Sequence, residues 1–62
     1  MTYDEAKRAF DDGAQVKYKG YTYERINAII FRRVAGEKLI QLELQDAADR
    51  SVTVARMEAV ET

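Results

Sequence analysis

The chain has 62 residues and a net charge of −1, and it contains no Cys and no His. A chain of this length forms one domain with a small core, and its near-neutral charge means that nucleic-acid binding needs a local basic patch. Without Cys the chain can form no disulfide and no thiolate zinc site. Without His it lacks the side chain that most often transfers protons near neutral pH.

A short helix is predicted over about 3–12. Thr2, just before it, and Glu5 fit a capping box, in which each side chain accepts a hydrogen bond from the other residue's main-chain amide. Gly13 suits the left-handed position at which helices end. Apolar residues recur at helical spacing and can anchor the helix to the rest of the chain: Tyr3, Ala6, Ala9 and Phe10.

Four strands are predicted after the helix, followed by a single helical turn. Two-residue turns at Lys19-Gly20 and Ala35-Gly36 and a loop from Asp46 to Arg50 separate the strands. The expected strands lie at about 14–19, 21–34, 38–45 and 51–55, and the final turn lies at about 56–60. We therefore expect a mainly β (α+β) fold with antiparallel strands, in a single domain that covers residues 1–62.

The turns also predict which residues pair across the strands. The first two turns give the pairs Val16–Tyr23, Tyr18–Tyr21, Ile29–Leu42 and Phe31–Ile40. A loop centred on Ala48 adds the pairs Leu44–Val52 and Leu42–Val54. All of these apolar side chains then share one face, which supports the register, because a one-residue slip would move each of them to the solvent.

A second apolar stripe lies out of phase with this face. Its members are Ile26, Ala28, Ile30 and Leu39. A strand that is apolar on both sides and runs past Arg25 and Asn27 usually bends, and a bent strand lets a small sheet curl into a barrel. The stripe then needs a cover, either the helix or a second copy of the chain. These four residues are the candidate self-association surface.

The order of the elements resembles the small barrels of the SH3-like and Sm-like groups, which implies a four- to five-stranded antiparallel barrel after a short helix. Bacterial Sm-like RNA-binding rings are similar in their N-terminal helix and in a Gly at the first turn, here Gly20. Their signature of Lys and His near the last strand is missing from Val54-Ala55-Arg56, which weakens the case for RNA binding of the ring type. The start Tyr3-Asp4-Glu5-Ala6 also resembles small proteins of phages and mobile elements, some of which inhibit host defence.

No group of residues in the sequence points to catalysis. Ser51 and the threonines have no His to activate them as nucleophiles. Paired carboxylates occur at Asp4/Glu5, Asp11/Asp12 and Asp46/Asp49. A chain this small has little room for a cleft that would raise the pKa of a carboxyl group, so these pairs are expected on the surface. We expect no enzyme activity, no cofactor and no metal site.

The first hairpin carries the main candidate for partner binding. Three tyrosines interleave with cations there, an arrangement that can stack bases between phosphate contacts or form a protein interface. The alternative is that the tyrosines pack in the core or at the barrel rim. With two cations of the next hairpin at its margin, the candidate surface is Tyr18, Tyr21, Tyr23, Arg25, Arg32 and Lys38.

The expected function is non-enzymatic protein–protein binding by a homo-oligomer, with a phage or mobile-element accessory or inhibitor protein as one form of it. The alternative is nucleic-acid or nucleotide binding through the tyrosine and arginine hairpin. The longest apolar runs have three or four residues, as at Ala28 to Phe31, and Met1 leads into a polar stretch. We therefore expect neither a signal peptide nor a membrane span, and a cytoplasmic location.

Overall fold

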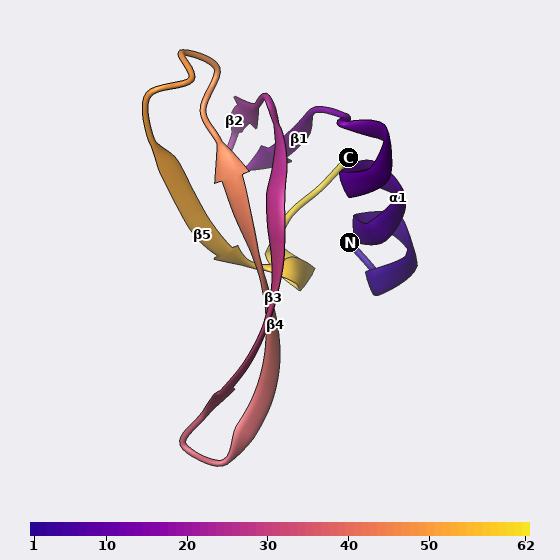
Figure 1. Ribbon diagram of the computed structural model, residues 1–62, viewed down its shortest axis with the longest axis vertical. Helices are drawn as coiled ribbons and strands as arrows, with labels where there is room; N and C mark the ends of the chain where they lie inside the picture. The colour runs from indigo at the N-terminus through magenta and orange to yellow at the C-terminus, as the bar shows by residue number, and fades with distance from the viewer.

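The structure is a computed structural model that describes all residues from Met1 to Thr62. In chain order its elements are α1 (Tyr3–Asp12), β1 (Val16–Tyr18), β2 (Tyr21–Tyr23), β3 (Arg25–Val34), β4 (Glu37–Gln45), β5 (Val52–Arg56) and the 3-10 helix η1 (Met57–Ala59) (Figure 1). β1 pairs with β2, and β3, β4 and β5 form a second sheet in that order. Every pairing is antiparallel, so the mainly β fold with a short helix is confirmed.

Both ends of α1 form as the sequence predicts. Thr2 N donates to Glu5 Oε1 at 2.7 Å, and Glu5 N donates to Thr2 Oγ1 at 3.2 Å, which completes the capping box. The hydrogen bonds with the Thr2 main chain and side chain hold the pKa of the Glu5 carboxyl below its usual value, because they favour the ionised form. Gly13 ends the helix with a φ of 64°. Only Ala6 and Ala9 are buried, so α1 presents a narrow apolar side to the core.

The first two hairpins have the predicted register. Lys19 and Gly20 have φ values of 50° and 80°. Ala35 and Gly36 repeat this pattern with 52° and 81°, values typical of two-residue hairpin turns. All the pairs expected from these turns are observed: Val16–Tyr23, Tyr18–Tyr21, Ile29–Leu42 and Phe31–Ile40.

The third hairpin differs from the prediction by one residue. Two predicted pairs are wrong: Leu44–Val52 and Leu42–Val54. The observed pairs are Leu44–Thr53 and Leu42–Ala55. Because a shift of one residue reverses the faces of a strand, Val52 and Val54 point away from the core and are 50% and 47% exposed.

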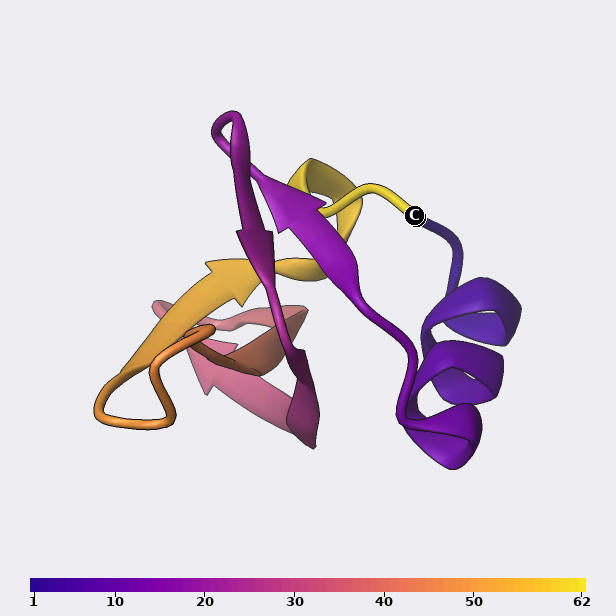
Figure 2. The same ribbon diagram turned by 90° about the horizontal axis from the view of Figure 1, so that it is seen from above.

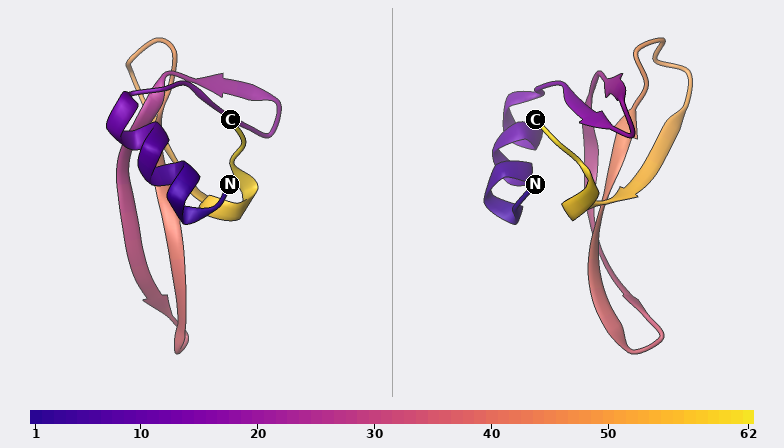
Figure 3. Two further views of the ribbon diagram at one scale, coloured as in Figure 1. Left: turned by 90° about the vertical axis from the view of Figure 1, so that its right-hand side faces the viewer. Right: turned by 180° about the vertical axis from the view of Figure 1, so that it is seen from behind.

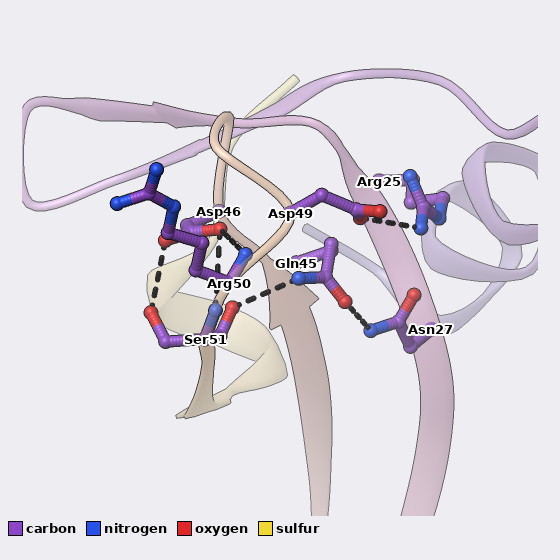
Figure 4. A network of polar contacts seen from close by, with 7 residues as sticks. All are labelled: Arg25, Asn27, Gln45, Asp46, Asp49, Arg50 and Ser51. Atoms are coloured by element: carbon purple, nitrogen blue, oxygen red, sulfur yellow. Dashed lines mark hydrogen bonds and ion pairs between the residues drawn. The ribbon is translucent and has the colours of Figure 1, made fainter.

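The Asp46 side chain explains this shift (Figure 4). Its Oδ1 accepts from the main-chain amides of Arg50 at 2.8 Å and Ser51 at 3.3 Å, and its Oδ2 accepts from the Ser51 hydroxyl at 2.9 Å. Asp46 N also donates to the Ser51 carbonyl at 3.1 Å. The loop therefore closes between Asp46 and Ser51 and contains an even number of residues, whereas a loop centred on Ala48 contains an odd number.

The long second strand is broken and bent. Glu24 separates β2 from β3, and the β3–β4 register shifts between Ile26 and Ala28, so Asn27 is the extra residue of a β-bulge. Asn27 Nδ2 donates to Gln45 Oε1 at 2.7 Å on the neighbouring strand. The bulge turns Ile26 into the core, where it is 3% exposed. Ile26 therefore does not share a face with Ala28, and its place in the predicted apolar stripe is wrong.

The buried core consists of Ala6, Ala9, Val16, Ile26, Leu42, Leu44, Ala55 and Val60. Main-chain hydrogen bonds connect the elements around it. Lys17 and Glu61 exchange bonds of 2.7 and 2.8 Å, which tie the C-terminal segment to β1. Glu24 N donates to Gln45 O at 2.8 Å, which ties the junction of β2 and β3 to β4. α1 and β5 lie on opposite sides of the molecule (Figure 2).

The paired ends of β3 and β4 project from this body as a twisted ribbon (Figure 3). We call this ribbon, residues 31–40, the arm. β5 does not extend along it, because the last pair of β4 and β5 is Gln41–Arg56. The arm is therefore two strands wide, and no third strand pairs with it.

Candidate functional site

A groove lies where the arm meets η1. It has a volume of about 790 Å³ and is lined by ten residues of β3, β4, η1 and the end of β5. The groove exists because β5 stops opposite Gln41 while β4 begins at Glu37. One side of β4 is left without a neighbouring strand over residues 37–40.

Four apolar side chains line the groove: Phe31, Leu39, Ile40 and Met57. Phe31 is 67% exposed, yet its ring is in contact with Tyr3 of α1, with centroids 5.8 Å apart and an interplanar angle of 61°. This edge-to-face geometry is favourable for aromatic pairs and restrains the ring. Met57 packs against the core on the other side. A large apolar surface that is exposed and restrained in this way is typical of a binding site.

Four cations also line the groove: Arg32, Arg33, Lys38 and Arg56. Arg33 and Lys38 share the face of Phe31 and Ile40, whereas Arg32 shares the opposite face with Leu39. Two carboxylates, Glu37 and Glu58, also line the groove, so its formal charge is +2 in a chain of net charge −1. Arg56 Nη1 lies 3.9 Å from Glu58 Oε1, but both side chains are more than 60% exposed and water screens the pair. The groove is therefore a locally positive region that attracts acidic groups.

Two of the three tyrosines of the β1–β2 hairpin pack against the core. Tyr18 and Tyr23 are half-buried against the core, with ring centroids 6.5 Å apart. Lys19 Nζ lies 5.4 Å from the centroid of the Tyr18 ring, within the range of a cation–π contact. Tyr21 alone of the three is exposed, at 71%. Arg25 pairs with Asp49 at 2.9 Å (Figure 4).

The six residues predicted as one partner surface are divided by the fold. The tyrosines and Arg25 belong to the β1–β2 hairpin and the adjoining start of β3. Arg32 and Lys38 lie in the arm, at the other end of the molecule (Figure 1). These two cations line the groove, and the sequence prediction of the partner surface missed the other residues that line it, among them Phe31, Ile40, Arg56 and Met57. The Phe31–Ile40 pair was predicted correctly but was expected to be covered.

The residues predicted for self-association are also divided. Ile26 lies in the core. The other three lie on the opposite face of the three-stranded sheet, which we call the outer face: Ala28, Ile30 and Leu39. Val52 and Val54 extend the outer face onto β5 because of the shifted third hairpin.

The predicted carboxylate pairs lie on the surface of α1 and in the third loop. Lys7 and Asp11 form an ion pair of 3.8 Å along α1. The main-chain amide of Arg50 and the Ser51 hydroxyl hold the pKa of Asp46 below its usual value, so this carboxylate acts as a hydrogen-bond acceptor for the loop. No cluster of three or more acidic side chains is placed to hold a metal ion. Neither helical segment combines the length and apolar character needed to cross a membrane.

Comparisons with protein-family models, with curated proteins and with solved structures found no match.

Proposed function

We propose that the chain is a non-enzymatic protein-binding module, and that the groove beside the arm takes an acidic, amphipathic segment of a partner protein. The observation that carries this proposal is the combination of an exposed Phe31 with four cations in one groove of a chain that is net negative. Aromatic residues and Arg are enriched at protein interfaces and supply most of the residues that dominate binding energy.

The free side of β4 suits an extended partner segment. Over residues 37–40 the main chain of β4 has β3 on one side and no strand on the other. An extended segment can pair with such an edge and place alternate side chains into the groove. Apolar side chains of the segment would contact Phe31 and Ile40 on one face of the arm. Its carboxylates alternate to the opposite face, where they would meet Arg32 and Arg56.

A nucleic acid is a weaker candidate for the same groove. Phe31 is the one aromatic residue that lines it, and Glu37 and Glu58 oppose phosphate groups there. The tyrosines that could stack on bases lie at the other end of the molecule, and Tyr18 and Tyr23 pack against the core. Direct comparison of an acidic peptide with an oligonucleotide separates the two candidates, because a phosphate-binding site would prefer the oligonucleotide and would lose that binding steeply as the salt concentration rises.

Fluorescence anisotropy with labelled probes tests the proposal. The probes are a synthetic peptide that alternates Leu and Glu, a matched peptide that alternates Leu and Lys, and single-stranded oligothymidine. The acidic peptide is expected to bind best. Phe31→Ala and Arg32→Glu should each weaken its binding by about tenfold or more. Tyr21→Ala is the matched control, since Tyr21 is 71% exposed and Phe31 is 67% exposed.

The proposal is wrong if the wild-type chain binds both peptides equally or binds neither of them. It is also wrong if Tyr21→Ala weakens binding as much as Phe31→Ala, because the site would then lie on the first hairpin. Tight binding of oligothymidine that is lost between low and moderate salt would replace a protein partner with a nucleic acid.

We also propose that the two sheets together form a small barrel of the SH3-like or Sm-like kind. Two sets of main-chain bonds support this proposal: Lys17 and Glu61 tie β1 to the segment that follows η1, and Glu24 N donates to Gln45 O, which ties the end of the first sheet to β4. Amide hydrogen exchange tests it. The amides of Lys17 and Glu61 should exchange as slowly as those in the middle of β4. Fast exchange at both would show that these bonds do not hold, and would contradict the barrel.

A further inference from the structure

β5 is an open edge of the three-stranded sheet. It pairs with β4 on one side and with no strand on the other. Most proteins protect such edges with Lys, Pro or a bulge, because an open edge is a template for another strand. β5 has no Lys, Pro or bulge, and its single charged residue, Arg56, lies at its end. Its outward side chains include Val52 and Val54, which are 50% and 47% exposed.

The main-chain groups on this edge follow from the loop before β5. Asp46 N donates to the Ser51 carbonyl, so this pair is hydrogen-bonded across the two strands. In an antiparallel ladder hydrogen-bonded pairs alternate with non-bonded pairs. Thr53 and Ala55 therefore bond to β4, while the N–H and C=O groups of Val52, Val54 and Arg56 point to the open edge.

We propose that β5 pairs with β5 of a second copy of this chain, antiparallel about a two-fold axis at Val54. Val54 then faces the partner's Val54, and Val52 faces the partner's Arg56. Val52, Val54 and Arg56 have their main-chain groups on the open edge, so each pair that they form in this register can exchange two hydrogen bonds, and Thr53 and Ala55 form the non-bonded pairs between them. The two three-stranded sheets become one sheet of six strands, and the interface uses the same surface of both copies.

The charges along β5 favour an antiparallel second copy. Arg56 places a cation at the end of the strand. In the loop before the strand, Asp49 is paired with Arg25, and the carboxylate of Asp46 is held at the start of β5. Antiparallel pairing brings Arg56 beside the partner's Val52 and so toward the partner's Asp46, and the two-fold axis repeats this contact. A parallel arrangement would bring like charges together.

The pairing also covers exposed apolar surface. Val54 of each copy meets its equivalent on the outer face, where cross-strand pairs of β-branched residues stabilise a sheet. Val52 is covered by the aliphatic part of the partner's Arg56 side chain. A chain of 62 residues has a small core, so burial of these side chains stabilises both copies.

Light scattering coupled to size exclusion, at several protein concentrations, tests the pairing. The wild-type chain should shift from monomer to dimer mass as its concentration rises. Val54→Lys places a charge on the axis and should keep the chain monomeric at every concentration. Val34→Lys is the matched control, because Val34 is 48% exposed on the same outer face but lies in the arm. This variant should form dimers as the wild type does.

Amide hydrogen exchange of the wild-type chain gives a second measurement that needs no variant. The amide of Val54 should exchange fast in dilute protein and slowly at concentrations where the dimer mass is seen. The proposal is overturned by a monomer at all concentrations, by a dimer that Val54→Lys leaves intact, or by a dimer in which the Val54 amide still exchanges fast. Phe31→Ala, which should weaken peptide binding in the groove, should still form the dimer. The experiments therefore distinguish failure of the dimer proposal from failure of the groove proposal.

Discussion

Asn27 and Gln45 are joined side chain to side chain across β3 and β4, with Nδ2 of Asn27 donating to Oε1 of Gln45 at 2.7 Å (Figure 4). Gln45 is 9% exposed, and its Nε2 donates to the Ser51 carbonyl at 3.0 Å, so it connects the β-bulge to the third loop. Gln45→Leu would leave both groups without these partners. We expect it to lower the free energy of unfolding by about 1–3 kcal/mol, measured by urea denaturation.

Gln41→Leu is the matched control for this change. Gln41 lies on the same strand and the same face, but its Oε1 is buried without a hydrogen-bond partner. Replacing it removes an unsatisfied acceptor, so stability should stay the same or rise. Equal losses in Gln41→Leu and Gln45→Leu would show that shape, and not hydrogen bonding, determines the effect at these positions.

Two neighbouring residues of β5 test the shifted register. Ala55 is 3% exposed and Val54 is 47% exposed. Ala55→Asp should lower the free energy of unfolding by several kcal/mol, because it buries a charge without a partner. Val54→Asp should change it by less than about 1 kcal/mol in dilute protein. Thermal unfolding followed by circular dichroism measures both, and the predicted register would require the opposite order.

The two hairpin turns that the sequence predicts correctly share a simple signal. Lys19-Gly20 and Ala35-Gly36 each end in a Gly, and two-residue turns need positive φ at both positions. The third loop has no Gly, and its length is determined by hydrogen bonds of the Asp46 side chain. Such bonds have no regular spacing in the sequence, so the prediction missed their effect by one residue.

The groove exists because β5 ends before it reaches the start of β4, and the alternation of apolar residues within a strand does not predict where a neighbouring strand ends. Arg32 and Lys38 were correctly expected to be accessible, but they were placed beside the tyrosine hairpin. Their distance from it depends on the length of β3, and the exposure of Phe31 depends on β5 ending opposite Gln41. The bulge at Asn27 likewise moved Ile26 into the core. Alternation alone could not predict this change of face.

Acid should weaken the third loop. The hydrogen bonds from Arg50 and Ser51 lower the pKa of Asp46 in the folded chain. A lowered folded pKa means that the stabilisation is fully present above the unfolded pKa of about 3.9 and is lost as the pH falls through the folded value. Asp46→Asn removes this titration, so its stability should fall less steeply with acid than that of the wild type. Urea midpoints measured across this pH range give the comparison.

Asp12→Asn is the control for the acid experiment. Asp12 is an exposed carboxylate at the end of α1 that makes no hydrogen bond or ion pair through its side chain. Its variant keeps the hydrogen bonds of Asp46, so its stability should still fall as acid protonates that loop. Glu5 also has a lowered pKa and contributes with the same sign, so part of the acid dependence should survive in Asp46→Asn. An unchanged slope in Asp46→Asn would contradict the role assigned to the loop.

The turn of the arm offers a change that should stabilise the chain. Ala35 has a φ of 52°, a left-handed conformation that is unfavourable by roughly 1–2 kcal/mol for residues with a Cβ but is tolerated by Asn. Ala35→Asn should recover part of this energy and raise the urea midpoint. Gly36→Ala should lower the urea midpoint, because Gly36 has a φ of 81°, which strains the backbone of any residue with a Cβ. An added Cβ would meet no atom within 4 Å, so this backbone strain would be the whole effect. Equal midpoints in both variants would mean that the arm adopts a different turn.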